Sequence, residues 1–468
     1  MSQHNRSRPV DAPRRSRTVF DPINPHVAGI DCGSATHYVA VPPDRDPQPV
    51  RHFPTFTSDL HALADWLTAC GVTSVAMEAT GVYWIAIYEL LEARGLDVRL
   101  VNARHVKNVP GKKSDVADCE WLRDLHSVGL LRGSFRPADQ IVALRTYVRH
   151  RQTLIETAST AIQRMQKALV QMNLQLALVV SDITGATGLR ILRDIVAGRR
   201  DPQQLAQHRD GRCHATPAEI VAALTGHYRA DYLFVLEQEL ALFDMCQTQI
   251  AACDGAIDAQ LQTLTADRPA PDRALPAARR PHRAAKNNDL ACDVRPALFQ
   301  LTGGIDLTQI DGLGSLNALK LLAEIGTDMS RWPTDKHFTS WLTLAPRNKI
   351  TGGRLLSSRT QPSANRAAGI LRMAAMSLGR TQTALGAFYR RLAARIGKPQ
   401  AITATARKLA VLVYRMLKGT LVYQDPGADH YNATQRARVL RRLRQRADAL
   451  GFELVNRTTG EILSPGVS

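Results

Sequence analysis

Apolar and polar residues alternate along positions 27–41 in a pattern that predicts two β-strands joined by a tight turn. The first apolar run ends in Asp31, and Gly33 follows almost directly. An ionised aspartate has no favourable place inside a covered sheet unless it faces water or a cation. We therefore interpret Asp31 as the first member of a metal-binding set of carboxylates. The glycine is a position where a ligand or another backbone can approach closely.

Strand and helix patterns then alternate up to about residue 137. The predicted strands lie near 50–56, 73–80 and 97–102, and the predicted helices near 59–70 and 82–94. This succession is typical of a mixed α/β sheet with helices on its faces. The strand near 73–80 also carries a carboxylate at its end, Glu78. Sites in such sheets form at the carboxyl ends of the strands, so Asp31 and Glu78 are candidates for one site.

Two further carboxylates open a predicted helix. Ser114 has the character of an N-cap, and Asp115 and Asp118 are three residues apart, on one helical face. Taken alone, this pair is explained by the helix dipole, which favours acidic residues in a first turn. Together with Asp31 and Glu78 it forms a set of four oxygen donors, which suits two Mg²⁺ ions. Two such ions about 3.5–4 Å apart stabilise the attacking and leaving oxygens of a phosphodiester.

Two long helical patterns follow, near 138–180 and 216–264, and their apolar spacing of three to four residues indicates an antiparallel coiled-coil or bundle arm. A segment rich in Pro, Ala and Arg then reads as a basic linker. We divide the chain into a disordered basic tail (1–24), an α/β domain (25–137), the helical arm (138–266), the linker (267–296), a mainly α C-terminal domain (297–430) and a basic C-terminal tail (431–468).

The C-terminal domain contains two segments suited to nucleic acid. Gly312 and Gly314 precede an apolar helix, as in a helix-hairpin-helix element whose N–H groups face a phosphate, although an ordinary packing turn has the same pattern. Residues 341–360 form a loop rich in hydroxyl and basic side chains, a composition also found in solvent loops. Hydroxyls beside cations suit phosphate contacts or a nucleophile at phosphorus. The predicted basic DNA contacts are Lys112, Lys113, Arg347, Lys349, Arg354 and Arg359.

Charge and cysteine content narrow the class of protein. The 468 residues include 60 Lys and Arg against 42 Asp and Glu, a net charge of +18, which favours a polyanionic partner over a basic protein without one. The seven cysteines are scattered without a CxxC pair, which argues for a reducing cytoplasm and against zinc or disulfides. The first twenty residues are polar and rich in Arg, so we expect a basic tail and not a signal peptide, and no apolar run of about 18 residues predicts a transmembrane span. We expect a cytoplasmic, nucleoid-associated protein with no membrane partner.

Taken together, these motifs resemble the insertion-sequence-110 family of bacterial transposases, also called DEDD transposases. The local signatures are Gly29-Ile30-Asp31, Met77-Glu78-Ala79-Thr80-Gly81, Lys113-Ser114-Asp115-Val116-Ala117-Asp118 and Ala345-Pro346-Arg347-Asn348-Lys349-Ile350-Thr351-Gly352-Gly353. The resemblance implies a RuvC-like, RNase H-type N-terminal domain. It also implies a second catalytic domain, in which a serine before glycine links to DNA. Thr351 stands at that position; it carries the same hydroxyl, but its β-branch restricts the rotamer. Ser357 and Ser358 are rival nucleophiles.

The resemblance further implies a recombinase that cuts and rejoins element ends with a target DNA, using two Mg²⁺ ions, with Mn²⁺ as a substitute. Its composite site would join the carboxylates of one subunit to the hydroxyl of another within a homodimer or homotetramer. An element-encoded non-coding RNA would guide the choice of DNA. Two alternatives stay open from the residues alone: a RuvC-like structure-selective endonuclease and a catalytically inactive nucleic-acid-binding protein. The large second domain favours the recombinase, because hydrolysis needs only metal-activated water.

Overall fold

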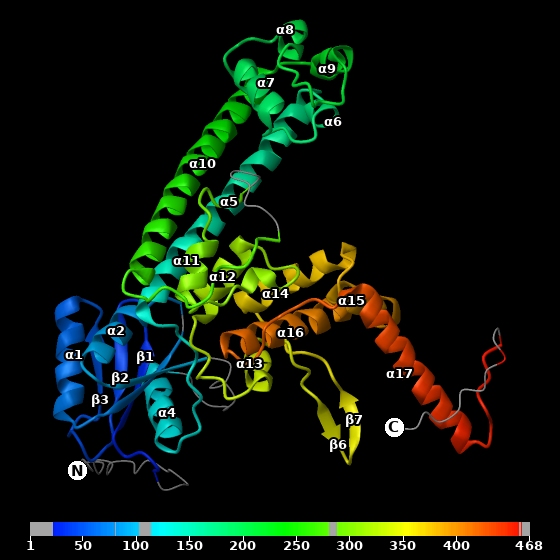
Figure 1. Cartoon of the computed structure of the whole chain (residues 1–468). Coiled ribbons are helices and arrows are strands. Elements are labelled where there is room, and N and C mark those ends of the chain that lie inside the picture. Colours follow the sequence, from blue (N-terminus) through cyan, green and yellow to red (C-terminus); the bar gives the residue numbers. More distant parts are fainter. Residues whose placement is uncertain (1–21, 80, 103–113, 280–287, 458–459, 461–468) are drawn as a thin grey trace, which may run out of the picture. The chain divides into compact units, whose positions relative to one another are not determined.

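The computed structural model describes residues 22–79, 81–102, 114–279, 288–457 and 460. The chain divides into two compact units, Met1–Arg136 and Pro137–Ser468. The first unit is built on a five-stranded sheet in the order β3-β2-β1-β4-β5 (Figure 1). Its strands are β1 (Val27–Cys32), β2 (Thr36–Ala40), β3 (Val50–Pro54), β4 (Ser74–Glu78) and β5 (Asp97–Val101).

The sheet is mixed, as the alternating sequence pattern predicts. β2 pairs antiparallel with both β1 and β3, whereas β1–β4 and β4–β5 are parallel pairs. The parallel pairs require crossover connections, which the helices between these strands supply. The mixed α/β fold is therefore confirmed, and its strand order agrees with an RNase H-like domain.

Helices cover both faces of this sheet. α1 (Thr57–Ala69) and α2 (Ile85–Ala93) pack on one face, where Ile30 and Met77 belong to the same buried cluster as Leu63 and Leu91. α4 (Asp115–Ser127) packs on the other face through Leu122, which contacts Ala76 and Val101. Successive strand residues point to opposite faces, so the positions two apart from Gly29 and Ala76 face α4. Those positions are Asp31 and Glu78.

The second unit begins with two long helices, α5 (Asp139–Gln171) and α10 (Ala230–Thr265), which lie side by side (Figure 1). Met165, Leu169, Leu236 and Leu240 are buried between them. The pattern near 216–264, predicted as one helical stretch, is two helices in the structure, α9 (Pro217–Leu224) and α10. At the far end of the pair lie α9 and three further helices: α6 (Leu176–Val179), α7 (Ala186–Val196) and α8 (Pro202–Ala206).

The rest of the second unit is mainly helical. Its elements are α11 (Arg295–Leu301), η1 (Leu307–Gln309), α12 (Ser315–Ile325), α13 (Asp335–Trp341), β6 (Lys349–Thr351), β7 (Arg354–Ser357), α14 (Arg366–Ser377), η2 (Leu378–Arg380), α15 (Ala384–Ile396), α16 (Lys398–Leu417) and α17 (Gly427–Ala449). α16 is packed against α13, α14 and α15. The segment 431–468, expected as a basic tail, begins inside α17. In the described part of the chain, no helix is both long and apolar enough to cross a membrane.

Candidate active site

Two of the four predicted carboxylates lie on neighbouring strands. The parallel register of β1 and β4 pairs Ile30 with Met77, so the next positions along these strands are Asp31 and Glu78. Both side chains are half-buried, and both come at the carboxyl ends of their strands. Parallel strands end at one edge of the sheet, which brings these two acids together although 46 residues separate them in the sequence.

The direction of α4 decides where the other two carboxylates lie. Near the end of α4, the Nε2 atom of His126 is 2.8 Å from the Oγ of Ser74, the first residue of β4. The Ser127 carbonyl accepts a hydrogen bond of 2.9 Å from the Asn24 amide, just before β1. The end of α4 therefore lies at the start of β1 and β4, and α4 runs antiparallel to both strands. Its first turn, with Asp115 and Asp118, points toward the strand ends that carry Asp31 and Glu78.

A capped helix start holds that first turn. The Ser114 hydroxyl accepts a hydrogen bond of 3.2 Å from the Ala117 amide, as the N-cap pattern predicts. Asp115 is exposed and Asp118 is half-buried. Both lie three residues apart on the capped turn, so their carboxylates share one side of the helix.

The four carboxylates do not form a closed metal site in this structure. Within the described ranges, no three or more Asp, Glu, His or Cys side chains gather closely enough to hold a metal ion. Asp31 and Glu78 are brought together, while Asp115 and Asp118 share their edge of the sheet without joining them in a group of three. All four donors are carboxylates, which is the chemistry that Mg²⁺ prefers. Lys112 and Lys113, the predicted DNA contacts nearest to this edge in sequence, fall outside the described residues.

The field of the carboxylates reaches two buried thiols. Burial raises the pKa of Cys32 to about 12, and the charges of Asp31 and Glu78 add to the shift. Burial likewise raises the pKa of Cys119 on α4 to about 12, with smaller contributions from Glu120 and Asp31. Both thiols stay protonated near neutral pH, so neither is a thiolate ligand, and hard oxygen donors dominate this edge.

Gly29 lets α4 lie directly on the sheet, and the sequence interpretation did not assign it this role. A Cβ atom on Gly29 would overlap the carbonyl oxygen of Cys119 and the amide nitrogen of Arg123. Arg123 is itself buried, and its Nη1 donates a hydrogen bond of 3.0 Å to the carbonyl oxygen of Val41. A glycine two residues before Asp31 inside a buried strand was the available signal for this close approach.

We expect Gly29→Ala to lower the free energy of unfolding by about 3 kcal/mol, because the added methyl group meets backbone atoms that cannot rotate away. Thermal and urea unfolding followed by circular dichroism measure the change. Gly255→Ala is the matched control: Gly255 lies within α10 with no heavy atom close to an added Cβ, so it should gain up to about 1 kcal/mol. Equal stability of Gly29→Ala and the parent chain would contradict this packing.

His126 makes the docking of α4 sensitive to acid. The side chain is 2% exposed, and burial, aided by the charge of Arg99, lowers its pKa from 6.5 to about 4. The unfolded chain therefore binds a proton between about pH 6.5 and 4 that the folded chain does not. The contribution of His126 to the free energy of unfolding is fully present above pH 6.5. It is lost as the pH falls through this window, by up to about 1.4 kcal/mol per pH unit.

We expect His126→Gln to flatten this dependence. Melting temperatures of both proteins measured from pH 7 to 4 should converge on acidification, since only the parent chain loses the contribution of a neutral buried imidazole. His61→Gln, at an exposed position of α1, is the control and should leave the pH dependence as it is. Parallel curves for the parent chain and His126→Gln would show that this histidine does not govern the acid response.

Thr351 lies at the tip of a β-hairpin that the sequence interpretation treated as a loop. Thr351 ends β6 and pairs with Arg354 at the start of β7. Gly352 and Gly353 form the turn with φ of 53° and 74°, the left-handed conformation that glycine adopts without strain. A Gly-Gly pair between two short β-prone runs was the signal for this hairpin. The hydroxyl of Thr351 belongs to an exposed residue, so another molecule can reach it.

The rival hydroxyls and the predicted basic contacts lie on the same hairpin or at its base. Ser357 is half-buried, and its Oγ accepts a hydrogen bond of 3.4 Å from the Arg359 amide, whereas Ser358 is exposed. The exposed cations around the hairpin are Arg347, Lys349, Arg354 and Arg359. This set matches what a phosphate backbone requires, because guanidinium and ammonium groups stay charged and hydrated until a phosphate replaces water.

Packing within the protein explains one of the two glycines in the turn before α12. Gly312 has a φ of 86°, and a Cβ atom there would lie 2.9 Å from the carbonyl oxygen of Ala374 on α14. Gly314 is the N-cap of α12 and has open space around it. The element before the turn is the three-residue η1 in place of a full helix. Packing against α14 therefore accounts for Gly312, and only Gly314 is open to a ligand.

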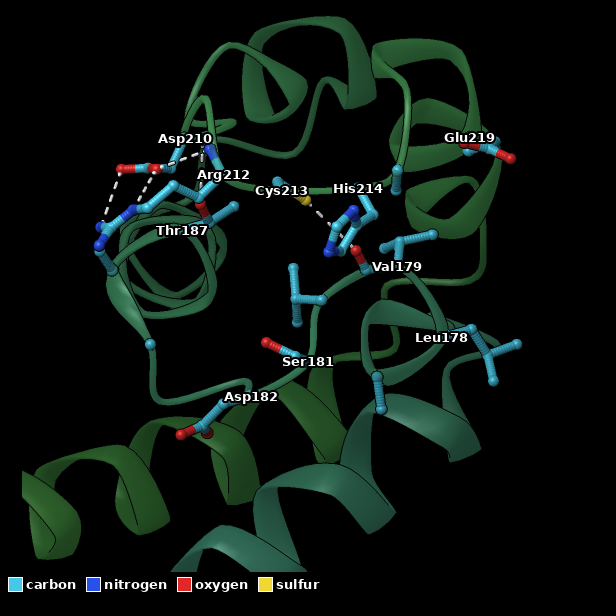
Figure 2. A pocket seen from close by; sticks show the side chains of 15 residues that line it. Leu178, Val179, Ser181, Asp182, Thr187, Asp210, Arg212, Cys213, His214 and Glu219 are labelled. Atoms are coloured by element: carbon cyan, nitrogen blue, oxygen red, sulfur yellow. Dashed lines mark hydrogen bonds and ion pairs between the residues drawn. The ribbon is translucent and has the colours of Figure 1, made fainter. Parts of the chain in front are cut away.

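One hollow of the second unit lies elsewhere, among α6, α7 and α9. It has a volume of about 810 Å³ and includes none of the predicted site residues. Figure 2 shows Asp210 bound to Arg212 on one wall, and the sulfur of Cys213 next to the carbonyl of Val179. Glu219 is engaged in the capping box of α9. These polar groups are engaged in contacts within the tip, and the hollow contains none of the carboxylates or hydroxyls predicted for catalysis.

Comparison with protein families decides the identity. A family model of IS110-type DEDD transposases, described as "Transposase", matches residues 28–174. A second model, described as "Transposase IS116/IS110/IS902 family", matches residues 306–390. The chain belongs to the IS110 family of DEDD transposases. None of the curated proteins compared with this transposase matches it.

The two matches include every catalytic residue that the sequence predicts. Asp31, Glu78, Asp115 and Asp118 fall within the first match, and Thr351 falls within the second. The transposase is a DNA-processing enzyme, and DNA is its substrate. Residues 175–305 and 391–468 lie outside both matches, so the helices at the far end of α5 and α10, and the whole of α17, are features that the family models do not describe.

Proposed function

We propose that this transposase cuts and rejoins DNA at a site formed by Asp31, Glu78, Asp115 and Asp118, with Thr351 as the nucleophile. The observation that carries the proposal is the alignment of β1, β4 and α4. It sets Asp31 beside Glu78 and directs the first turn of α4 to the same edge of the sheet. Like-charged groups on one edge of a sheet repel one another, so a divalent cation would stabilise them as one site.

The four carboxylates would hold two Mg²⁺ ions, or Mn²⁺ in their place. When bound, these ions supply charge stabilisation for the attacking and leaving oxygens of a phosphodiester. Asp31 and Glu78 come from a rigid pair of strands, so they would fix the position of the metal site. Asp118 and Asp115 come from a helix start and would complete it.

The chain's own contribution to the reaction is the hydroxyl of Thr351. Its Oγ attacks phosphorus, a bond from Oγ to phosphorus forms, and the bond from phosphorus to the leaving deoxyribose oxygen breaks. The Thr351 proton passes to solvent or a nearby base, and the leaving oxygen takes up a proton. Attack by a second DNA hydroxyl then reverses these steps and releases Thr351. The exposed cations Lys349 and Arg354 flank the hydroxyl on the hairpin and would hold the DNA phosphates in place.

The exposed hairpin supports a site shared between subunits of a homodimer or homotetramer. Thr351 stands in the open, where a carboxylate edge from another copy can meet it. We also propose that an element-encoded RNA guides the choice of donor and target DNA, which the family resemblance implies and the net charge of +18 accommodates.

Incubation of the purified protein with DNA carrying element ends tests this function. Mg²⁺ should yield both joined DNA and a covalent protein–DNA adduct that survives denaturing electrophoresis, and EDTA should abolish both. Cleavage without an adduct would replace the proposal with a structure-selective nuclease. Sequencing the nucleic acid that co-purifies, followed by RNase treatment before the assay, tests guidance by RNA; full activity after RNase would overturn that part.

A further inference from the structure

The helix α17, Gly427–Ala449, has an unusual composition for a surface helix. It carries six arginines against two aspartates and contains no lysine. Ala428 is the single buried residue of this helix. Figure 1 shows α17 leading away from α15 and α16. A helix that buries a single residue contributes little to the hydrophobic core, and its exposed surface is accessible to a partner.

The first turns of α17 are fixed to the helical body. The Ala428 amide donates a hydrogen bond of 3.2 Å to the carbonyl oxygen of Gln382. The Tyr431 hydroxyl accepts a hydrogen bond of 2.8 Å from the Nε of Arg391, and the Tyr431 ring meets Phe388 edge to face at 6.2 Å. This end is held, and most side chains of the remaining turns are exposed to solvent.

The arginines occupy a defined part of the helix surface. At about 100° per residue, the apolar side chains lie within a sector of roughly 100°, and five arginines spread over the opposite ~200°. The apolar sector contains Val439, Leu440, Leu443, Ala447 and Leu450. We define the arginine face by its four exposed members outside that sector: Arg438, Arg441, Arg442 and Arg446. Among the described residues, Arg444 alone of the six arginines forms an ion pair, with Asp448 at 3.7 Å.

We propose that the arginine face of α17 binds the phosphate backbone of duplex DNA from within the major groove. A helix with its side chains is about 10–12 Å across, and the major groove of B-DNA is about 12 Å wide. The groove of A-form RNA is too narrow to admit it. Guanidinium groups suit this role because they stay charged and bind phosphate oxygens in pairs. The proposal needs only DNA as the substrate and does not depend on the carboxylate site.

A second copy of the chain fits this surface less well. Pairing two α17 helices along their apolar sectors would bring twelve arginines into one bundle, with four aspartates to offset them. Such like-charge crowding opposes association unless a polyanion is already present. Phosphates on both sides of a groove neutralise the arginine face directly, so DNA is the occupant to which the charge distribution points.

Fluorescence anisotropy of a labelled duplex, measured with the full chain in EDTA over a range of NaCl concentrations, tests the proposal. The quadruple variant R438Q/R441Q/R442Q/R446Q should reduce the slope of log K against log[salt] by about 3.6, since each lost phosphate contact contributes about 0.9. Its affinity at low salt should fall at least about tenfold. Because EDTA excludes metal-dependent chemistry, the measurement is independent of the proposed function. Melting curves should match the parent chain, since the four side chains are exposed.

Two matched variants control for charge. R190Q/R193Q/R200Q/R212Q removes the same number of exposed arginines from the far end of α5 and α10 and should change the slope by less than about one. The four Arg→Lys changes on the arginine face should restore most of the slope. If R190Q/R193Q/R200Q/R212Q lowers the slope as much as the quadruple variant of the arginine face does, net charge alone explains the effect and the proposal is overturned.

Three further outcomes would also overturn it. The first is an unchanged slope in the quadruple Gln variant. The second is tighter binding of duplex RNA than of duplex DNA of the same sequence, lost in that variant. The third is a loss of DNA binding in V439Q/L443Q together with a smaller oligomer on size-exclusion chromatography, which would assign the helix to contact between copies.

Discussion

Asp31→Asn is expected to lower DNA strand transfer by about a thousandfold or more while DNA binding persists. Asp31 lies beside Glu78 at the end of a rigid strand pair, and the amide removes one negative charge and one ligand oxygen from the proposed metal site. A thousandfold loss corresponds to about 4 kcal/mol of transition-state stabilisation, which is reasonable for a ligand of a phosphoryl-transfer metal. Product formation from element-end DNA measures the first effect, and anisotropy measures the second.

Asp44→Asn is the matched control, because Asp44 is an exposed aspartate of the same unit with only a loose ion pair to Arg45. It should retain full activity. Asp115→Asn and Asp118→Asn, made separately, then rank the contributions of the α4 turn. Strand transfer by Asp31→Asn at the parent rate would contradict the proposed carboxylate site. Loss of DNA binding in the same variant would assign Asp31 to structure instead of chemistry.

Thr351→Ala should abolish the covalent protein–DNA adduct, because the hairpin tip then lacks the hydroxyl that attacks phosphorus. Thr351→Ser should keep the adduct and form it at least as fast, since serine has no β-branch to restrict the hydroxyl. The backbone of the tip depends on Gly352 and Gly353, so neither change disturbs the turn. Denaturing electrophoresis with labelled DNA follows the adduct directly.

Ser357→Ala and Ser358→Ala are the controls, on the same hairpin and at its base. Both should form the adduct at the parent level. If the adduct persists in Thr351→Ala and disappears in one of these variants, the serine replaced in that variant is the nucleophile. Ser358 is then the stronger rival by exposure, because Ser357 is half-buried and its hydroxyl oxygen accepts the Arg359 amide.

The elements of the first unit could be predicted closely from sequence. Short alternating runs bounded by Gly, Pro and polar residues predicted the strands, and each predicted range overlaps an observed strand or helix. The N-cap of α4 was likewise visible, because capping depends on a local Ser114–Ala117 contact. The hairpin β6–β7 was missed because hydroxyl and basic residues dominated its interpretation, although Gly352-Gly353 carries the turn signal.

The second unit was harder to predict. The break between α9 and α10 lies at residues 225–229, where the His227 amide donates a hydrogen bond of 2.8 Å to the carbonyl oxygen of Met172, a tertiary contact that periodicity alone does not reveal. The sequence pattern predicts a tail where the structure has α17, because a run of arginines is typical of disordered arms as well as of helices. Its first turns are ordered by contacts with Gln382 and Phe388, residues distant in the sequence.

The sequence by itself indicated the family, predicted the alternation of strands and helices, and singled out the four carboxylates and Thr351 as candidate site residues. These depend on local patterns and on residue types at fixed short spacing. Only the tertiary structure decided the register that sets Asp31 beside Glu78, the antiparallel course of α4 over Gly29, and the exposure of Thr351 and the arginine face. Each of these is set by packing between residues far apart in the chain, where no local spacing carries the information.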